Sequence, residues 1–479
     1  MRNIFLIFIF TLSIFSTNSE EWKFFKSADY VRISDTIIKD LDGDGIDEIT
    51  ISYYDYNGKK VDVYKIENSE LKLIDRINVP PSTIYFDVGD INNDKKAEIV
   101  FLASDGLYFR TIGENKQLTC IPSIFSEIVV SQPQLLKSVN LVMDLEGKGK
   151  NQLVIQNIKA IEIYETTNFS KLSSINLETF LEFSMVPGQF YPQYIFYTFP
   201  MTFITDIDGD GKKEIITKFP SSINIYAQQS LNKWYRKSVI KISKDNIYFL
   251  INSFVKFTFP VISNINNDNK KEIIVSSAHL DIPKLRFEAL GDIYYEKNRD
   301  YVNDTAKQIV VKGVPLNLPV FLNISSKEYK DFIIPVIPFN IFTIFSILSG
   351  SGTIDVPFLY YQQTSNGFDT KKSRKLFEIP FRMENIVAFI EELPIDHYQD
   401  GEFPDFYYFS NNRKERKTDI IQYSLDDKKN SYKNETIIKL DYVVNWGETS
   451  VLKLGTFSKS KKKEVAYITG HHIFLITRK

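Results

Sequence analysis

The segment DLDGDGIDEITI, which begins at Asp40, places acidic side chains at alternate positions around two glycines and then continues into an apolar run. Ca²⁺ takes about six to eight oxygen ligands, and a loop can wrap around it with side-chain oxygens at positions one, three and five, a backbone carbonyl at seven and a carboxylate beyond. Glycine permits the tight turn that such a loop needs. The segment therefore predicts a calcium site formed by Asp40, Asp42, Asp44, the carbonyl of Ile46, and Glu48.

The same frame recurs in DINNDKKAEIVF, DIDGDGKKEIIT and NINNDNKKEIIV. The corresponding candidate ligands are Asp90, Asn92, Asp94, the carbonyl of Lys96, and Glu98; Asp206, Asp208, Asp210, the carbonyl of Lys212, and Glu214; and Asn264, Asn266, Asp268 and Glu272. The third of these sets has only two carboxylates, so we expect weaker calcium binding there. The alternative is that the loops are solvated acidic turns. Recurrence, and the repulsion between uncompensated carboxylates, favour the metal.

Four further copies have lost acidic residues. In DLEGKGKNQLVI, Lys148 stands where the third acid would be, and we expect its ammonium to neutralise Asp144 and Glu146 in place of an ion. The copies at Asn323 and Thr456 retain few acids. In DHYQDGEFPDFYYF, which begins at Asp396 with one extra residue, a hydrogen-bonded turn is favoured over an ion held by Asp400 and Asp405.

The spacing of the copies indicates a repeat architecture. Their first positions are residues 40, 90, 144, 206, 264, 323, 396 and 456, so neighbours lie 50 to 73 residues apart. An apolar segment precedes each loop, a second strand leaves it, a third follows, and a more polar fourth closes several units. Four short antiparallel strands per repeat form the blade of a β-propeller. The sequence therefore predicts an all-β propeller of eight four-stranded blades, with seven as the alternative because the copy at Asn323 is poor.

The two ends of the sequence indicate how the ring closes and in which compartment the protein is expected. The last unit stops after its third strand, so we expect Glu21 to Ser27 to supply its outer strand. Residues 1–19 read as a signal peptide, with Arg2 ahead of an apolar run that is shorter than the roughly 20 residues of a spanning helix; an uncleaved anchor is the alternative. The run from Phe332 to Leu348 contains two prolines and fits buried strands better than a membrane span. Residues 20–479 are thus expected to form a single propeller domain that is secreted or displayed on the cell surface.

The DxDGDGxxE frame followed by an apolar strand resembles the FG-GAP or VCBS-type repeats, which form the propeller of integrin alpha subunits and occur in many secreted microbial proteins. The specific matches are DLDGDGIDEI at Asp40 and DIDGDGKKEI at Asp206. The resemblance implies a calcium-dependent propeller whose ions staple the first two strands of a blade, with ligands on the loops of one face. The phenylalanine-glycine and glycine-alanine-proline signatures of integrin blades are not evident, so an integrin subunit is not expected.

The composition of the chain limits the classes of function that we expect. The formal net charge is −2, and nothing in the chain argues for nucleic acid. Cys120 is the only cysteine, and we expect it to be buried; His471 and His472 are expected on opposite sides of a strand. The favoured hypothesis is a calcium-binding module for adhesion, recognition or scaffolding, with a protein or glycan partner on one face. The alternatives are a polysaccharide lyase or hydrolase, and a subunit of a larger assembly, with or without attachment to a membrane. N-glycosylation would be permitted in a eukaryotic host at Asn168, Asn303, Asn323 and Asn434.

Overall fold

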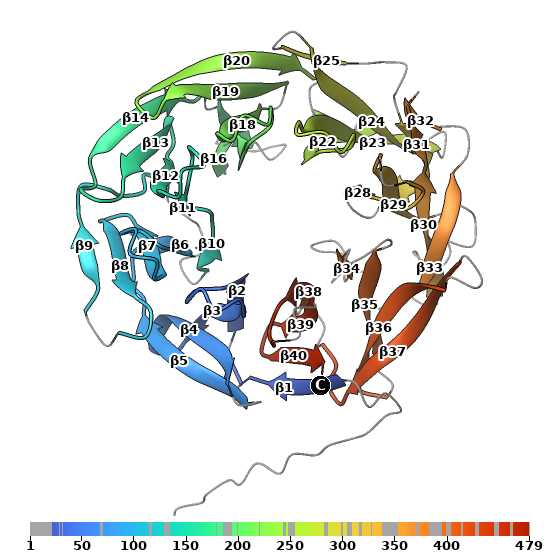
Figure 1. Cartoon of the computed structure of the whole chain (residues 1–479), viewed down its shortest axis with the longest axis horizontal. Helices are drawn as coiled ribbons and strands as arrows, with labels where there is room; N and C mark the ends of the chain where they lie inside the picture. Colours follow the sequence, from blue (N-terminus) through green and yellow to red (C-terminus); the bar gives the residue numbers. More distant parts are fainter. Residues whose placement is uncertain are drawn as a thin grey trace, which may run out of the picture.

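The computed structural model of the chain consists of β-strands arranged in a ring around a central channel (Figure 1). The proposed signal peptide and Asp400 lie outside the described residues. The structure describes residues 22–478 except 28, 31, 68–69, 115–116, 129–134, 179, 185–193, 199, 220, 243–245, 248–253, 282–285, 298–299, 304–308, 316–318, 327, 338–352, 366, 370–372, 383–394, 399–403, 413–414, 427–430, 445–449 and 460–462.

The first four blades follow the chain from the inner strand outward. Blade one contains β2 (Arg32–Lys39), β3 (Glu48–Asp55), β4 (Gly58–Glu67) and β5 (Glu70–Asn78). Blade two contains β6 (Thr83–Gly89), β7 (Glu98–Ala103), β8 (Leu107–Thr111) and β9 (Thr119–Ile121), with β10 (Lys137–Ser138) added in parallel to β6. Blade three contains β11 (Val142–Met143), β12 (Gln152–Gln156), β13 (Ala160–Glu165) and β14 (Lys171–Asn176), and is followed by the hairpin β15 (Phe180–Ser184) and β16 (Tyr194–Thr198). Blade four contains β17 (Met201–Thr205), β18 (Glu214–Phe219), β19 (Ser222–Ser230) and β20 (Lys233–Lys241).

The other four blades complete the ring. Blade five contains β21 (Asn246–Ile247), β22 (Phe254–Ser263), β23 (Glu272–Asp281), β24 (Arg286–Lys297), β25 (Asp300–Asn303) and β26 (Ile309–Lys312). Blade six contains β27 (Val314–Pro315), β28 (Val320–Leu322), β29 (Asp331–Ile337), β30 (Thr353–Tyr361) and β33 (Arg374–Arg382), with the hairpin β31 (Gln363–Thr364) and β32 (Gly367–Phe368). Blade seven contains β34 (Ile395–Tyr398), β35 (Asp405–Asn412), β36 (Lys417–Asp426) and β37 (Ser431–Leu440). Blade eight contains β38 (Ser450–Gly455), β39 (Glu464–Thr469), β40 (Ile473–Arg478) and β1 (Trp22–Lys26). The eight-bladed propeller is therefore confirmed.

The ring is closed by the amino-terminal strand, as the sequence predicts. β1 pairs antiparallel with β40, with Trp22 opposite Arg478 and Lys26 opposite Phe474. The join continues beyond the strands, since the Tyr30 N–H donates to the His471 carbonyl (3.0 Å) and the Tyr30 hydroxyl donates to the buried Asp62 (3.1 Å). The first and last parts of the chain thus share one blade.

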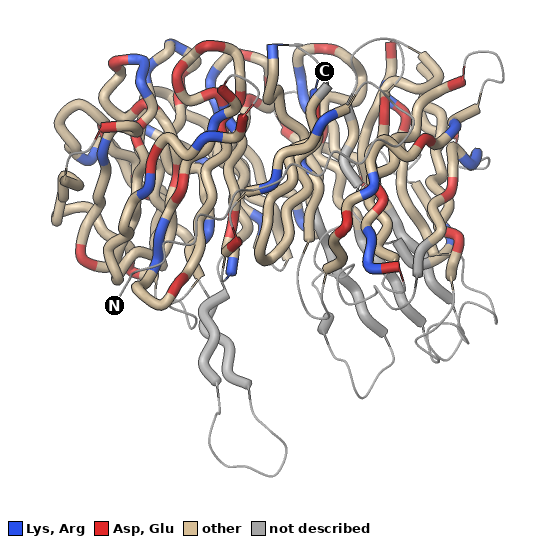
Figure 2. The backbone as a smooth tube through the Cα atoms, turned by 90° about the horizontal axis from the view of Figure 1, so that it is seen from below, with Lys and Arg blue, Asp and Glu red and all other residues tan. Residues whose placement is uncertain are grey.

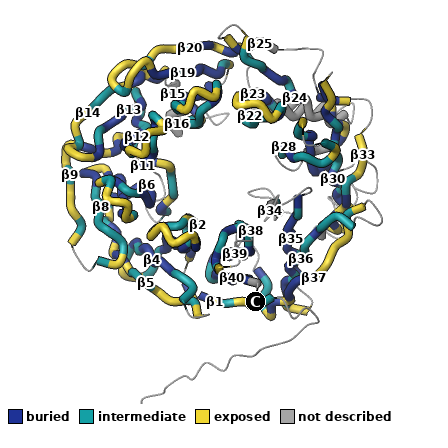
Figure 3. Tube along the Cα trace, viewed as in Figure 1, coloured by how far each residue is buried: buried dark blue, intermediate teal, exposed yellow. Residues whose placement is uncertain are grey.

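The core lies between blades. Every residue of β7, β18 and β39 is buried, which explains the continuous apolar character of the second strands. The outer strands β5 and β20 carry many exposed residues, as Figure 3 shows along the rim. Clusters join neighbouring blades, as where Leu153 packs with Leu102 of the preceding blade. Each fully buried side chain of this kind stabilises the fold by about 1.5–3 kcal/mol.

Some local predictions were wrong. Asp396 lies within β34, opposite Tyr407, so it does not occupy the first position after a strand as the first residue of the other copies does. Cys120 is exposed, because it lies in the three-residue outer strand β9 and not in the core. His471 and His472 lie in the turn between β39 and β40 and not in a strand. In the part of the chain that the structure describes, no helix is long and apolar enough to span a membrane.

Candidate metal sites in the hairpin loops

In seven blades the repeated motif is the eight-residue loop between the first and second strands, as in residues 40–47 and 206–213. The second strand begins at the ninth position in each of these blades, for example at Glu48 and Glu214. Since the same connection is used each time, the loops share one face of the ring. Figure 2 shows acidic and basic residues close together along this face, at the top of the view. We call the seven eight-residue connections the loop belt; they are residues 40–47, 90–97, 144–151, 206–213, 264–271, 323–330 and 456–463.

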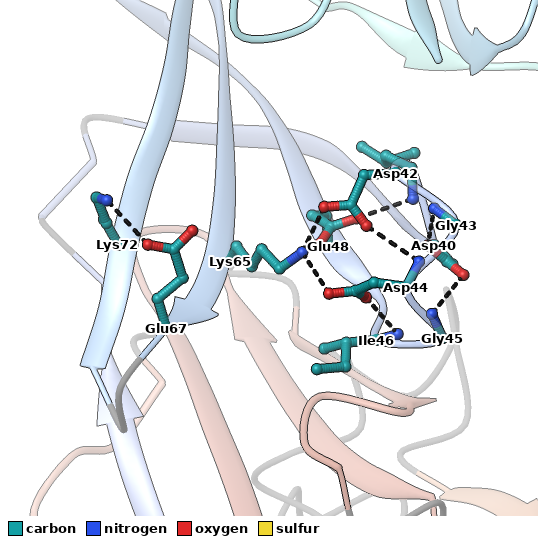
Figure 4. A network of polar contacts seen from close by, with 11 residues as sticks. Asp40, Asp42, Gly43, Asp44, Gly45, Ile46, Glu48, Lys65, Glu67 and Lys72 are labelled. Carbon is teal, nitrogen blue, oxygen red and sulfur yellow. Dashed lines mark hydrogen bonds and ion pairs between the residues drawn. The ribbon is translucent and has the colours of Figure 1, made fainter. Parts of the chain in front are cut away.

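In the first loop, the acidic side chains fold the backbone around themselves (Figure 4). The two oxygens of Asp40 accept the amides of Gly43 (2.7 Å) and Gly45 (2.9 Å), and Asp44 accepts the amide of Ile46 (2.8 Å). Gly43 and Gly45 have φ of 78° and 82°, values at which a side chain would be strained. The loop shape is therefore encoded by the alternation of aspartate and glycine.

The loop at Asp206 repeats this geometry. Asp206 accepts the amides of Gly209 (2.7 Å) and Gly211 (2.9 Å), and Asp208 accepts the amide of Asp210 (3.2 Å). The side chains also converge: Asp206, Asp208 and Asp210 each offer an oxygen within 4.8 Å of the others.

Asp40, Asp42 and Glu48 form a similar group in the first loop. The buried Glu48 Oε1 has no hydrogen-bond partner, although it lies 3.1 Å from a lysine ammonium. Converging hard oxygen ligands fit a Ca²⁺ ion.

The ninth residue of the repeat has a structural role that the sequence analysis did not assign. In seven blades its side chain accepts the N–H of the second residue and is only 0 to 4% exposed, so we call it the latch residue. The bonds run from Leu41 to Glu48 (2.8 Å), Ile91 to Glu98 (2.9 Å), Leu145 to Gln152 (2.9 Å), Ile207 to Glu214 (2.9 Å), Ile265 to Glu272 (3.0 Å), Ile324 to Asp331 (3.2 Å) and Phe457 to Glu464 (3.0 Å). Loops that have lost their acids keep the latch, so it stabilises the loop without a metal.

Burial affects how the latch residues ionise. It raises the pKa of Glu214 to about 7 and that of Glu272 to about 7, against the two favourable backbone hydrogen bonds from Ile207 and Ile265. The charges of Asp208 and Asp210 add to the effect at Glu214. Desolvation likewise raises the pKa of Glu48 and Glu98. A cation nearby would favour the ionised form of each.

Lysines from other strands approach the two acidic loops. The Nζ of Lys65, on β4, lies 2.5 Å from Asp42, 2.8 Å from Asp44 and 3.1 Å from Glu48 (Figure 4). Burial alone would lower the pKa of Lys65, but its hydrogen bonds to Asp42 and Asp44 outweigh burial and raise it. The carboxylates of this loop are thus compensated by a lysine.

The loop at Asp206 has a weaker counterpart of this contact. The Nζ of Lys237, on β20, lies 2.7 Å from Asp208 and 3.3 Å from Glu296, which also pairs with Lys270. Among the described residues, Lys237 forms an ion pair with a single carboxylate of the loop. Sequence reasoning missed both lysines because they come from the third and fourth strands of their blades.

The remaining candidate loops use their amides internally. Asn92 donates to Asp94 (3.1 Å) and Glu98 (3.3 Å), and Asn266 donates to Glu272 (2.8 Å). Asn264 donates to the Asp268 carbonyl. Neither loop belongs to the converging groups found among the described residues.

In the loop at Asp144 the predicted neutralisation is partial. Lys148 pairs with Glu146 (3.1 Å), as expected. The two oxygens of Asp144 instead accept the backbone amides of Glu146 and Gly149.

Neighbouring loops are joined to each other. The eighth residue donates its N–H to the carbonyl of the second residue in the preceding blade, as in Lys271 to Ile207 (2.8 Å) and Lys213 to Leu145 (2.9 Å). A Cβ on Gly209 would lie 2.4 Å from the carbonyl oxygen of Asn269 in the next loop, so only glycine fits there. An ion that orders one loop would therefore also support the contact with the next blade.

Comparisons with known proteins identify no family and only distant structural neighbours. The chain matches no protein-family model and no curated protein, so the likeness to FG-GAP and VCBS repeats rests on the loop frame. Among solved structures it is similar to the WD40 domain of SCAP from fission yeast (9% identity, 95% of this chain and 98% of that one, TM-score 0.43).

It is also similar to the exotype rhamnogalacturonan lyase YesX (12% identity, 95% and 72%, TM-score 0.34) and to a lectin of Agrocybe aegerita that recognises terminal N-acetylglucosamine (12% identity, 72% and 80%, TM-score 0.36). Likenesses of this strength carry no information about activity or ligands. What the structure itself establishes is an eight-bladed propeller with a belt of joined loops on one face.

Proposed function

We propose that this chain is a calcium-binding propeller, secreted or attached to a surface, that serves as a recognition or scaffold module for a protein or glycan partner. The observation that carries the proposal is the convergence of Asp206, Asp208 and Asp210, with carboxylate oxygens within 4.8 Å of one another. Aspartates brought this close repel each other without a cation. The resemblance to FG-GAP and VCBS repeats, and the leader-like residues 1–19, support a role outside the cell.

The residues that would hold the ion are those that the sequence singles out. In blade four they are Asp206, Asp208 and Asp210 with the Lys212 carbonyl, and in blade one the equivalent aspartates with the Ile46 carbonyl. Calcium would neutralise the carboxylates and cross-link the loop, which is a structural rather than a catalytic role.

The two sites are expected to differ in affinity. In blade one, the Lys65 ammonium contacts Asp42, Asp44 and Glu48 and must withdraw before an ion can be held. In blade four, Lys237 forms an ion pair with only one carboxylate of the loop, Asp208, within the part of the chain that the structure describes. We therefore expect the blade-four site to bind calcium more tightly, although the two loops offer the same number of carboxylates.

The loop belt is the surface that we assign to the partner. Its loops are joined blade to blade, so it is a preorganised surface, and preorganised surfaces lose less entropy on binding. Exposed side chains of both signs lie on it, among them Asp94, Lys96 and Lys150. Such a mixed surface suits a polar partner, whether a protein or a glycan.

The test is the calcium dependence of thermal unfolding for the chain and for Asp42→Ala and Asp208→Ala. An ion that binds only the folded state should add about 2.7 kcal/mol at a hundredfold excess over its dissociation constant. We expect this gain to be reduced by both substitutions, and more by Asp208→Ala. Asp441→Ala, at an exposed acid outside the belt, is the control and should respond as the unmodified chain does. A chain that is equally stable in calcium and in chelator would rule the metal out.

A further inference from the structure

A cavity of about 820 Å³ opens on the central channel beside blades two to five. Its wall includes Leu141, Phe203, Ile204, Val261 and Ile262, which belong to or flank the inner strands of these blades. No Asp, Glu, Lys, Arg or His occurs among the described residues that line it. The volume falls within the range of about 300–1,000 Å³ that is typical of small-molecule sites, and apolar lining with few polar groups is typical as well.

One end of this cavity lies at the loop belt. Thr205, the last residue of β17, lines the cavity and is followed directly by Asp206 of the loop. The Lys271 ammonium donates to the Thr205 hydroxyl. The Lys271 ammonium therefore lies next to Thr205, at the end of the cavity that adjoins the loop belt, although Lys271 does not itself line the cavity.

Lys271 belongs to a series of lysines. Lys213, Lys271 and Lys330 occupy the eighth position of three successive loops, are half-buried, and donate their N–H groups to the preceding blade in the same way. Burial lowers the pKa of Lys330, and electrostatic repulsion from the Lys271 ammonium lowers it further. Such a row of like charges is stabilised by an anion.

Two carboxylates that adjoin Thr205 and Lys271 in the sequence accept hydrogen bonds from other groups. Both oxygens of Asp206 accept amides of its own loop, and Glu272 accepts the Ile265 amide and the Asn266 side chain. The negative charge of Glu272 also acts on Lys330, whose pKa it raises. Among the described residues, no carboxylate forms an ion pair with Lys271. Its charge is available to a ligand.

We propose that the cavity binds a small amphipathic carboxylate, with its apolar chain against Phe203, Val261 and Ile262 and its carboxylate at Lys271 and Thr205. The apolar wall excludes a sugar or a multiply charged ligand, because polar groups buried there would lose hydrogen bonds to water without replacement. The lysine selects a single negative group at one end. Thr205 and Lys271 directly precede the candidate metal ligands Asp206 and Glu272, but neither of them is a candidate ligand itself.

The test uses isothermal titration calorimetry of the full chain with decanoate and, as the neutral probe of equal length, decanol. The experiment is run in chelator so that calcium soaps do not form. Lys271→Gln removes the charge but keeps a hydrogen-bond donor, and Val261→Trp fills the cavity. Lys96→Gln removes an exposed lysine of the belt in blade two and is the matched control.

We expect saturable decanoate binding that Lys271→Gln weakens about tenfold or more, since a charge-assisted hydrogen bond is replaced by a neutral one. Decanol binding should change less than twofold in this variant, and Lys96→Gln should leave both ligands unaffected. Val261→Trp should abolish binding of both. The absence of saturable binding to the unmodified chain would overturn the proposal, as would equal effects of Lys271→Gln and Lys96→Gln. If Val261→Trp fails to fold, the unmodified chain is tested instead by competition between decanoate and a neutral, environment-sensitive dye. Displacement of the dye by decanoate supports the proposal, and no displacement contradicts it.

Discussion

Replacing Lys65 with methionine tests the electrostatics of the first loop. The Lys65 side chain is 10% exposed and lies within 3.1 Å of three carboxylates. Asp42 and Asp44 are 54% and 42% exposed, so solvent screens these pairs and each is worth about 0.5–1 kcal/mol. Glu48 is 1% exposed, and loss of its cationic neighbour should cost about 1–3 kcal/mol. In chelator we therefore expect Lys65→Met to lower the free energy of unfolding by about 2–5 kcal/mol.

Calcium should reverse this loss. Without Lys65, the ion no longer has to displace an ammonium, so the stabilisation gained from calcium should be larger in Lys65→Met than in the unmodified chain. Urea unfolding in chelator and in excess calcium measures both effects. Lys72→Met is the control, because Lys72 pairs with Glu67 at the surface, where the two side chains are 61% and 40% exposed. If Lys65→Met were as stable as the unmodified chain in chelator, or gained no more from calcium, the assignment of Lys65 as a competitor for the site would be refuted.

Three further predictions concern the latch, pH and ring closure. Glu464→Ala should lower the free energy of unfolding in urea by about 2–4 kcal/mol, because the Phe457 N–H and the Ser458 hydroxyl both lose their acceptor. Glu464→Gln should lower it by less than about 1 kcal/mol, since Gln152 already serves as a latch residue in another blade. Equal losses in the two variants would refute the role of the latch residue. Burial raises the folded-state pKa of Glu272 from 4.5 to about 7, so the folded state binds this proton more tightly and its contribution to stability in chelator should fall as pH rises from about 4.5 through 7, by up to about 3 kcal/mol. Glu272→Gln should remove this contribution and leave that of Glu214, whose pKa is also raised to about 7; a pH profile unchanged by the substitution would contradict the prediction. A chain that begins at residue 28 lacks β1 and leaves β40 unpaired, so it should lose about 2–5 kcal/mol and recover on addition of a peptide of residues 21–27; full stability without the peptide would contradict the closure.

The repeat could be predicted from the sequence because its information is local. The frame that begins at Asp40 and ends at Glu48 specifies the loop shape through its own hydrogen bonds, and the same spacing locates the start of the second strand in the other blades. The unpaired strand at Glu21 to Ser27 predicted ring closure because the last unit stops after its third strand. Local patterns thus carried the architecture.

The sequence could not predict what depends on packing between distant segments. Lys65 contacts Asp42 because β4 pairs with β3. Lys237 contacts Asp208 from β20, which is separated from β18 by β19. The parallel strand β10 depends on contacts with β6 that no local pattern encodes. Around Asp396 the predicted register was wrong, because this residue lies inside β34 and not at the start of a loop. Cys120 was misjudged because its apolar neighbours mark a rim strand and not a core strand.

The most direct test of the account is calcium titration by isothermal calorimetry of the chain and of Asp42→Asn and Asp208→Asn, which keep the size of the side chain and remove one charge. The account predicts two or more bound ions per unmodified chain. The tightest site should be lost in Asp208→Asn, and a weaker one in Asp42→Asn. No saturable heat, or the same stoichiometry and affinities in all three proteins, would contradict the assignment of the loop belt as a set of calcium sites.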